Sequence, residues 1–153
     1  MTHWTQFETE APDLAKAVIA RFEAHKHHVL ATVRKDGSPR VSGTEVEFYE
    51  GTLLLGSMVA ARKVLDLRRD PRFALHSNPG HHTMEGGDAK ISGRAEEIVG
   101  ERKQQIVDHY PDEIGEADVF ELSVDEVVLT TVDGEHLYVD LWKPGRGVTR
   151  FTK

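Results

Sequence analysis

The stretch LATVRKDGSPRVSGTEVEFYEGTLLLGS, residues 30–57, indicates the fold most clearly, because it joins apolar segments through two short turns. Its segments predict strands at residues 27–34, 39–49 and 53–57, which are rich in β-branched and apolar side chains. An Asp-Gly pair lies in the first turn and a Glu-Gly pair in the second, as is typical of hairpins. Links this short join antiparallel neighbours, since a parallel pair needs a crossover of a dozen or more residues.

The rest of the chain continues this pattern with more strands and a few helices. Apolar periodicity predicts helices at residues 11–26 and 101–110 and a third between Ser57 and Pro71. Further strands are predicted at residues 72–77, 88–99, 119–132 and 137–142, with a hairpin turn at 133–136 and a polar tail at 143–153. Closing such a sheet removes its exposed edges, so we expect a mainly β fold, a small antiparallel barrel with added helices. No repeat or linker divides the chain, which predicts one domain over residues 1–153.

The segment GSMVAARKVLDLRRDP, residues 56–71, contains a helix with an unusual beginning. Its apolar residues fall on one arc and its charged residues, Asp66 among them, on the other. Asp70-Pro71 ends the helix, because a residue before proline avoids the helical conformation. Acidic side chains are favoured at a helix N-terminus, yet Arg62 and Lys63 are expected in or near the first turn.

A bound anion would explain that arrangement. A chain that turns from strand to helix at Gly56-Ser57 directs free N–H groups to one point, where Arg62 and Lys63 add positive charge. Ser57 adds a hydroxyl donor, and Arg40 on the neighbouring strand could reach the same place. The alternative is a solvated helix face whose long side chains point into water.

Composition limits the classes of function. The net charge is −7, from 19 basic and 26 acidic residues, which disfavours a nucleic-acid partner. Cysteine is absent, so disulfides and thiolate chemistry are excluded. No signal-peptide pattern or membrane-length apolar run is present, and we expect a cytoplasmic protein without a membrane partner. The histidines cluster without metal-ligand spacing, so no metal site is expected.

Three motifs follow one another within residues 30–75. They are Asp36-Gly37-Ser38-Pro39-Arg40, then Ser57 with Arg62-Lys63, then Leu67-Arg68-Arg69-Asp70-Pro71. In this order they resemble the pyridoxamine 5′-phosphate oxidase-like family of flavin-binding split barrels. The resemblance continues more loosely through residues 87–98 and 141–147.

The resemblance implies a homodimer with FMN at the subunit interface. By analogy with the family, the cofactor phosphate is held by Arg62, Lys63 and Arg40. The end of the third strand would line the cofactor through Ser57 and Met58. The second strand would run beside the flavin ring at Ser42, Gly43 and Thr44. Apart from the resemblance, Tyr138 and Trp142 on the last predicted strand are interpreted either as aromatics of a dimer interface or as groups that stack on a ligand, and Trp142 is a candidate cofactor-binding residue.

Two departures from the family pattern affect the expected activity. Glu45 occupies a position where the true oxidase has a basic residue for its phosphorylated substrate, and the family's C-terminal arginine and histidine region has no counterpart. Oxidation of pyridoxamine phosphate is therefore not expected. Related proteins bind a deazaflavin coenzyme, whose acidic tail would need basic residues such as Arg68, Arg69 and Lys90.

Two classes of function remain open at this point. The first is an FMN-dependent, or alternatively deazaflavin-dependent, oxidoreductase acting on a small organic substrate. The second is a non-catalytic flavin-binding or redox-sensing module, in which Trp142 or the loop at residues 79–87 would seal the ring. That loop is interpreted either as a lid or as disordered chain. A barrel without any ligand is the third possibility.

Overall fold

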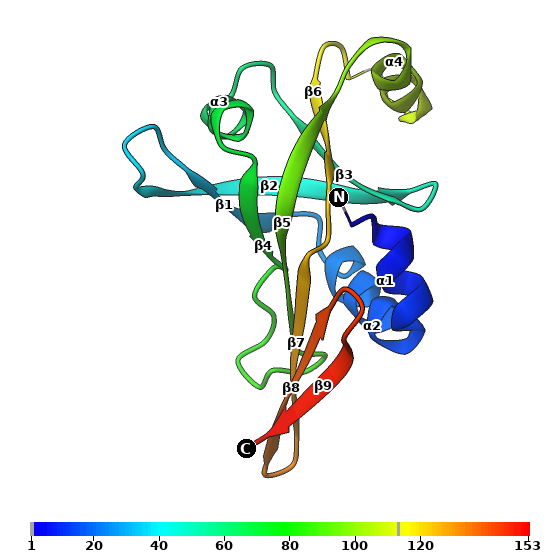
Figure 1. Cartoon of the computed structure of the whole chain (residues 1–153), viewed down its shortest axis with the longest axis vertical. Coiled ribbons are helices and arrows are strands. Elements are labelled where there is room, and N and C mark those ends of the chain that lie inside the picture. Colours follow the sequence, from blue (N-terminus) through cyan, green and yellow to red (C-terminus); the bar gives the residue numbers. More distant parts are fainter. Residues whose placement is uncertain (1, 113) are drawn as a thin grey trace.

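Strands dominate the computed structural model, which describes residues 2–112 and 114–153 (Figure 1). Its helices are α1 (Trp4–Glu10), α2 (Pro12–Glu23), α3 (Arg62–Arg69) and α4 (Gly100–His109). Its strands are β1 (His28–Val33), β2 (Pro39–Tyr49), β3 (Thr52–Ser57), β4 (Arg72–His76), β5 (Asp88–Ile98), β6 (Asp118–Leu122), β7 (Glu126–Asp133), β8 (His136–Lys143) and β9 (Gly147–Thr152).

Six strands form a closed antiparallel barrel, as the sequence predicts. Their order is β4-β1-β2-β3-β6-β5, and the pairing of β4 with β5 closes the ring. The long strand β5 pairs with β6 over Ala95–Ile98 and with β7 over Asp88–Ser92. The sheet therefore continues from the barrel into β7, β8 and β9, which extend below it in Figure 1.

The leucine run of β3 demonstrates how the strand alternates between two cores. Leu53 and Leu55 are buried inside the barrel. Leu54 points outward and is covered by α4, where it belongs to a second cluster with Ile106 and Val119. Side chains alternate between the two faces of a strand, so a continuous apolar run requires cover on both sides.

The N-terminal helices cover the side of the sheet on the right in Figure 1. The α1 helix was not predicted, since a seven-residue helix with two apolar anchors has too little periodicity to detect. Its anchors, Trp4 and Phe7, are nevertheless almost fully buried in the main core. The predicted helix at residues 11–26 is α2, which ends at Glu23. Among the described residues, no helix is both long and apolar enough to cross a membrane.

Two predictions near the C-terminus were wrong, one of a single strand and one of a polar tail. The segment 119–132 is not one strand, because the chain leaves β6 at Ser123 and starts β7 at Glu126. Gly93 permits this crossing, since a Cβ there would lie 2.3 Å from the Ser123 carbonyl oxygen. The polar tail contains β9, which pairs with β8 over Gly147–Thr152. Its side chains are mostly exposed, so hydrophobic alternation could not reveal it.

Candidate functional site

The α3 helix begins at Arg62, so Arg62 and Lys63 are its first two residues, as predicted. Its first turn has no acidic residue, and no side chain in the described part of the chain caps it. The first N–H groups of a helix lack partners inside the helix, and the helix dipole adds positive charge there. This end of α3 thus combines free donors with two cationic side chains, which suits an anion.

Lys63 connects the start of α3 to β2. The part of β2 before Glu45 has no β3 residue opposite it, because these two strands pair only over Glu45–Tyr49. One edge of β2 is therefore free there. Lys63 donates a hydrogen bond of 2.9 Å from Nζ to the carbonyl oxygen of Gly43 on this free edge. Burial lowers the pKa of Lys63, while the nearby Glu45 carboxylate acts in the opposite direction. The structure therefore brings Gly43, Lys63 and the start of α3 together.

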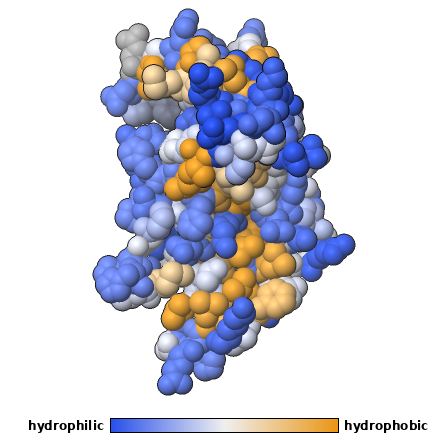
Figure 2. Space-filling view, turned by 90° about the vertical axis from the view of Figure 1, so that its left-hand side faces the viewer, coloured by the Kyte–Doolittle hydropathy of each residue, from blue (hydrophilic) through white to orange (hydrophobic). Residues whose placement is uncertain are grey.

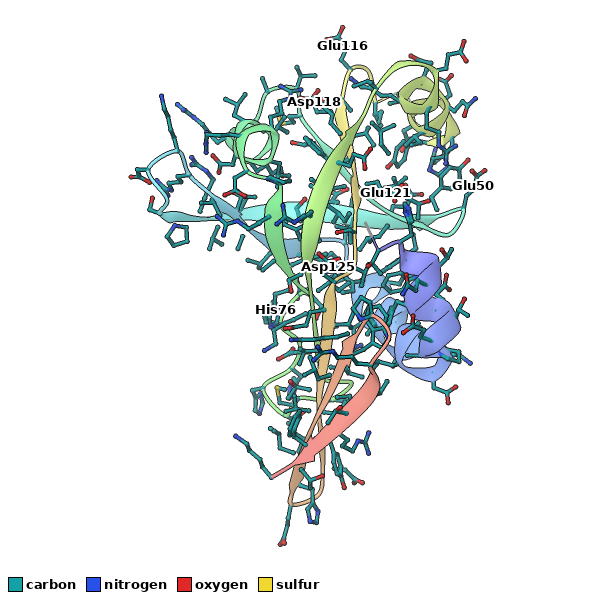
Figure 3. The ribbon with its side chains drawn as sticks, viewed as in Figure 1. Glu50, His76, Glu116, Asp118, Glu121 and Asp125 are labelled. Atoms are coloured by element: carbon teal, nitrogen blue, oxygen red, sulfur yellow. The ribbon has the colours of Figure 1, made fainter. Side chains whose placement is uncertain are left out.

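A buried aspartate fixes the turn between β3 and α3. The backbone N–H of Ala60 donates to Asp118 Oδ2 at 2.7 Å, and Ala60 has a φ of 55° in the left-handed region. Asp118 lies opposite Ser57 in the β3–β6 register and is 4% exposed. Figure 3 shows it at the end of β6 nearest α3. Asp118 was not predicted as a site residue, since nothing in its local sequence pattern distinguishes it from a surface acid.

A second buried aspartate, Asp66 on α3, lies beside Arg40. Asp66 Oδ2 accepts hydrogen bonds from Thr32 Oγ1 at 2.8 Å and from Arg40 Nε at 2.7 Å. Its Oδ1 accepts one from Arg69 Nη2 at 3.0 Å. Burial raises the pKa of Asp66, but the hydrogen bonds from Arg40, Thr32 and Arg69 outweigh it and leave the pKa below its usual value.

The prediction that Asp66 lies on the exposed arc of the helix was wrong. Asp66 is 2% exposed, whereas Leu65 from the predicted apolar arc is 42% exposed. A helical pattern treats every carboxylate as solvated, but three donors can compensate a buried one. Arg40 uses only its Nε in this contact and its side chain remains 22% exposed. Its two Nη groups have no hydrogen-bond partner among the described residues.

Of the other predicted cofactor-binding residues on β2 and β3, some face the inside of the barrel and others lie at the turn into α3. Thr44 is buried and lies opposite His28 on the inner face of the barrel, so its side chain cannot line a ligand outside. Ser42 faces the same way, opposite Leu30. The Ser57 hydroxyl donates to the carbonyl oxygen of its neighbour Met58 at 3.1 Å. Met58 itself is 83% exposed at the start of the turn.

Trp142 is not part of this site. It is fully buried in the main core, with its ring centroid 4.8 Å from that of Phe7. Its prediction as a cofactor-stacking residue was therefore wrong, because alternation along β8 directs it toward α1. The loop at residues 79–87 is also distant from α3 in Figure 1. Arg21 of α2 holds it by donating to the carbonyl oxygen of Glu85 at 3.2 Å.

Two of the basic residues considered for a deazaflavin tail already have acidic partners. Arg68 makes a bidentate contact with Glu97, at 2.9 and 2.8 Å, and lies 3.2 Å from Asp118. Arg69 binds Asp66 and the carbonyl oxygen of Val33. The third, Lys90, lies on the outer face of β5, away from α3.

That outer face carries an apolar groove of about 390 Å³. Figure 2 shows hydrophobic side chains gathered in a band on this side of the molecule. The groove crosses β1, β4, β5 and β7, and its lining includes Val29, Ala31, Ala74, His76, Lys90 and Val128. His76 is labelled in Figure 3. Strand register extends the apolar surface from Ala31 to Val41 on one side and from Val128 to Leu141 on the other.

The barrel and the cationic start of α3 agree with a comparison of family models. Residues 14–131 match the model described as pyridoxamine 5′-phosphate oxidase. The chain belongs to this family. Its members are FMN-binding proteins or enzymes, and they include FMN-dependent oxidases. No curated protein sequence matches the chain.

Solved structures share the fold at low sequence identity. PhzG from Burkholderia lata 383, solved with tetrahydrophenazine-1-carboxylic acid, has a TM-score of 0.65 and 13% identity, with 92% of this chain and 87% of that one covered. An FMN-binding protein related to pyridoxamine 5′-phosphate oxidase, from Nostoc punctiforme PCC 73102, has a TM-score of 0.64 and 13% identity, covering 94% and 95%. A heme-binding protein from Mycobacterium smegmatis has a TM-score of 0.53 and 16% identity, covering 89% and 86%.

Proposed function

We propose that the chain binds FMN as a homodimer and acts as an oxidoreductase on a small organic substrate. One observation carries the proposal: the uncapped start of α3, with Arg62 and Lys63, lies against the free edge of β2 near Arg40. Free N–H groups and two neighbouring cations match a phosphate, so the residues present fit the cofactor of the family. The FMN-binding relative from Nostoc adds support for this choice.

Within such a site, the protein would bind and orient the cofactor. Arg62 and Lys63 would hold its phosphate, and the edge of β2 at Gly43 would offer backbone groups beside the ring. When bound, a flavin supplies hydride transfer through its own ring, so a protein nucleophile is not needed. Neither of the elements expected to seal the ring, Trp142 and the loop at 79–87, lies at the start of α3. This supports an enzyme over a sealed redox-sensing module.

FMN is favoured over the deazaflavin coenzyme by the state of the arginines on α3. Both cofactors carry a phosphate, but the acidic tail of deazaflavin would need free cations nearby. Arg68 and Arg69 are instead engaged by Glu97 and Asp66. Deazaflavin therefore stays the second candidate, and a titration with each cofactor separates the two.

The phosphate site is tested by replacing both of its cations. We expect Arg62→Ala with Lys63→Ala to weaken FMN binding at least about 100-fold, because two charge-assisted contacts are lost. Riboflavin, which lacks the phosphate, should bind both proteins alike. The matched control is Arg146→Ala, which removes an exposed cation on the β8–β9 turn. Unchanged FMN affinity in the folded double variant would refute the assignment and indicate a solvated helix face.

A further inference from the structure

The network around Asp66 joins the candidate phosphate site to the barrel. Asp66 receives donors from β1, from β2 and from its own helix, through Thr32, Arg40 and Arg69. Its side chain is only 3% exposed. β2 and α3 lie side by side here, since Lys63 contacts Gly43 and Asp66 contacts Arg40. Asp66 is one helical turn from the start of α3.

Stability alone gives little reason for a carboxylate at this position. A buried ion pair is often no more stabilising than an apolar side chain of similar volume, because desolvation offsets the attraction. The geometry instead fixes orientation. Thr32 holds the carboxylate oxygen that binds Arg40, and Arg69 holds the other oxygen, so the carboxylate cannot rotate freely. Anchored through Nε, the Arg40 guanidinium loses most of its rotamer freedom while its Nη groups stay available.

We propose that Asp66 is a positioning residue that orients the Arg40 guanidinium toward the cofactor phosphate. The inference rests on the proposed function, since it takes a flavin phosphate as the ligand. Asp66 itself does not contact the phosphate. It acts through Arg40, by removing in advance the freedom that the side chain would otherwise lose on binding.

The test measures FMN and riboflavin affinity of Asp66→Asn by quenching of flavin fluorescence. Asparagine keeps the size of the side chain but replaces one accepting oxygen with a donor, which repels the donors that surround it. We expect FMN affinity to fall about tenfold, the effect of one charge-assisted contact, while riboflavin affinity stays unchanged. The matched control is Asp70→Asn, which breaks an aspartate–arginine contact at the other end of α3 and should leave both affinities unchanged.

A double-mutant cycle separates positioning from general damage. In an Arg40→Gln background, Asp66→Asn should produce no further loss of FMN affinity, because the side chain through which it acts is gone. The same tenfold loss in both backgrounds would overturn the proposal. So would a gain in FMN affinity, which would mean that Asp66 only neutralises Arg40.

Two further outcomes are covered by the same measurements. If Asp66→Asn does not fold, Thr32→Val can replace it, because this variant removes a single donor to the carboxylate. We expect it to lower FMN affinity about two- to threefold, which corresponds to roughly half the free energy of one hydrogen bond, and to leave riboflavin affinity unchanged. No change in FMN affinity in that variant would count against positioning.

The wild-type protein separates failure of this inference from failure of the proposed function. A wild type that does not prefer FMN over riboflavin would refute both together. A wild type that prefers FMN, with unchanged FMN affinity in Asp66→Asn, would refute the inference alone.

Discussion

At the scale of single residues, buried carboxylates shape the start of α3. Asp118 holds the turn that leads into the helix, through the N–H of Ala60, and Asp66 holds Arg40 beside it. Each carboxylate is almost completely removed from water. Removing a partner from a buried charge costs more than the pair itself contributes, so both positions are sensitive to substitution.

The strained backbone at Ala60 gives a prediction about stability. Its φ of 55° costs a residue with a Cβ about 1–2 kcal/mol. Glycine would remove this cost, but it would also give the unfolded chain more conformational entropy, which offsets part of the gain in stability. Ala60→Gly should therefore raise the free energy of unfolding by about 0.5 kcal/mol, measured by urea denaturation. Ala60→Val should lower it, because a β-branched side chain fits this conformation poorly. A stabilising effect of valine would contradict the assigned conformation.

His28 gives a prediction about pH. Burial lowers its pKa below the ordinary value of 6.5, and its Nδ1 accepts a hydrogen bond from the Asn78 backbone N–H at 2.9 Å. The unfolded chain therefore binds a proton more readily than the folded one, so this contribution to stability is complete above pH 6.5 and is lost as the pH falls toward the lower folded value. His28→Gln keeps an acceptor but does not titrate.

Urea unfolding at pH 7.5 and pH 5.5, spanning roughly one unit on either side of the histidine pKa, measures this effect. The loss of stability on acidification should be smaller in His28→Gln than in the wild type. His136→Gln, at an exposed position in β8, is the control and should behave as the wild type does. Equal pH dependence in all three proteins would mean that His28 does not titrate differently on folding.

How far the sequence predicts individual residues depends on what surrounds them. Arg62 and Lys63 are found at the start of α3 as predicted, because residues that begin and end helices can be recognised in the sequence. Asp66 and Trp142 were misplaced, since the first is compensated by donors from distant strands and the second is covered by an unpredicted helix. Contacts between distant segments decide both positions, and no local pattern encodes them.

At the scale of elements, α1 has a larger role than its length indicates. Its two aromatic anchors contact the core from outside the sheet, with Trp4 packed on Phe48 and Phe7 packed on Trp142. Phe7→Ala should lower the free energy of unfolding by about 3–5 kcal/mol, the usual effect of emptying a fully buried aromatic position. Thr9→Ala, at an exposed position of the same helix, should change it by less than about 0.5 kcal/mol. Similar losses in both variants would contradict the packing described.

Elements were predictable where turns and periodicity agree. The first three strands and α4 were located to within a residue or two, because Asp-Gly and Glu-Gly turns or an amphipathic pattern delimit them. The end of α3 at Arg69 agrees with the predicted stop at Asp70-Pro71, whereas for its start the sequence predicted only that Arg62 and Lys63 lie in or near the first turn. α1 and β9 were missed because each depends on its neighbour for stability. β9 has little apolar alternation of its own and is held by its ladder with β8.

At the scale of the whole molecule, the apolar groove and its surroundings form a face suited to a second copy of the chain. Val41 is 70% exposed and Phe151 50% exposed on the outer face of the sheet. A stable protein–protein interface buries roughly 800 Å² of the surface of each partner, and exposed apolar side chains such as these suit its centre. Val41→Glu should therefore convert the proposed homodimer to a monomer, as measured by light scattering after gel filtration. Val99→Glu, at the start of α4, should remain dimeric, and a Val41→Glu dimer would place the interface elsewhere.

Recognition of a phosphate at the start of α3 can be measured in a single titration. Purified wild-type protein is titrated with FMN and with riboflavin under identical conditions, and flavin fluorescence reports the two dissociation constants. We expect FMN to bind at least about 100-fold more tightly than riboflavin, since only FMN reaches Arg62, Lys63 and the helix N-terminus through a phosphate. Equal affinities, or no binding of either flavin, would contradict it.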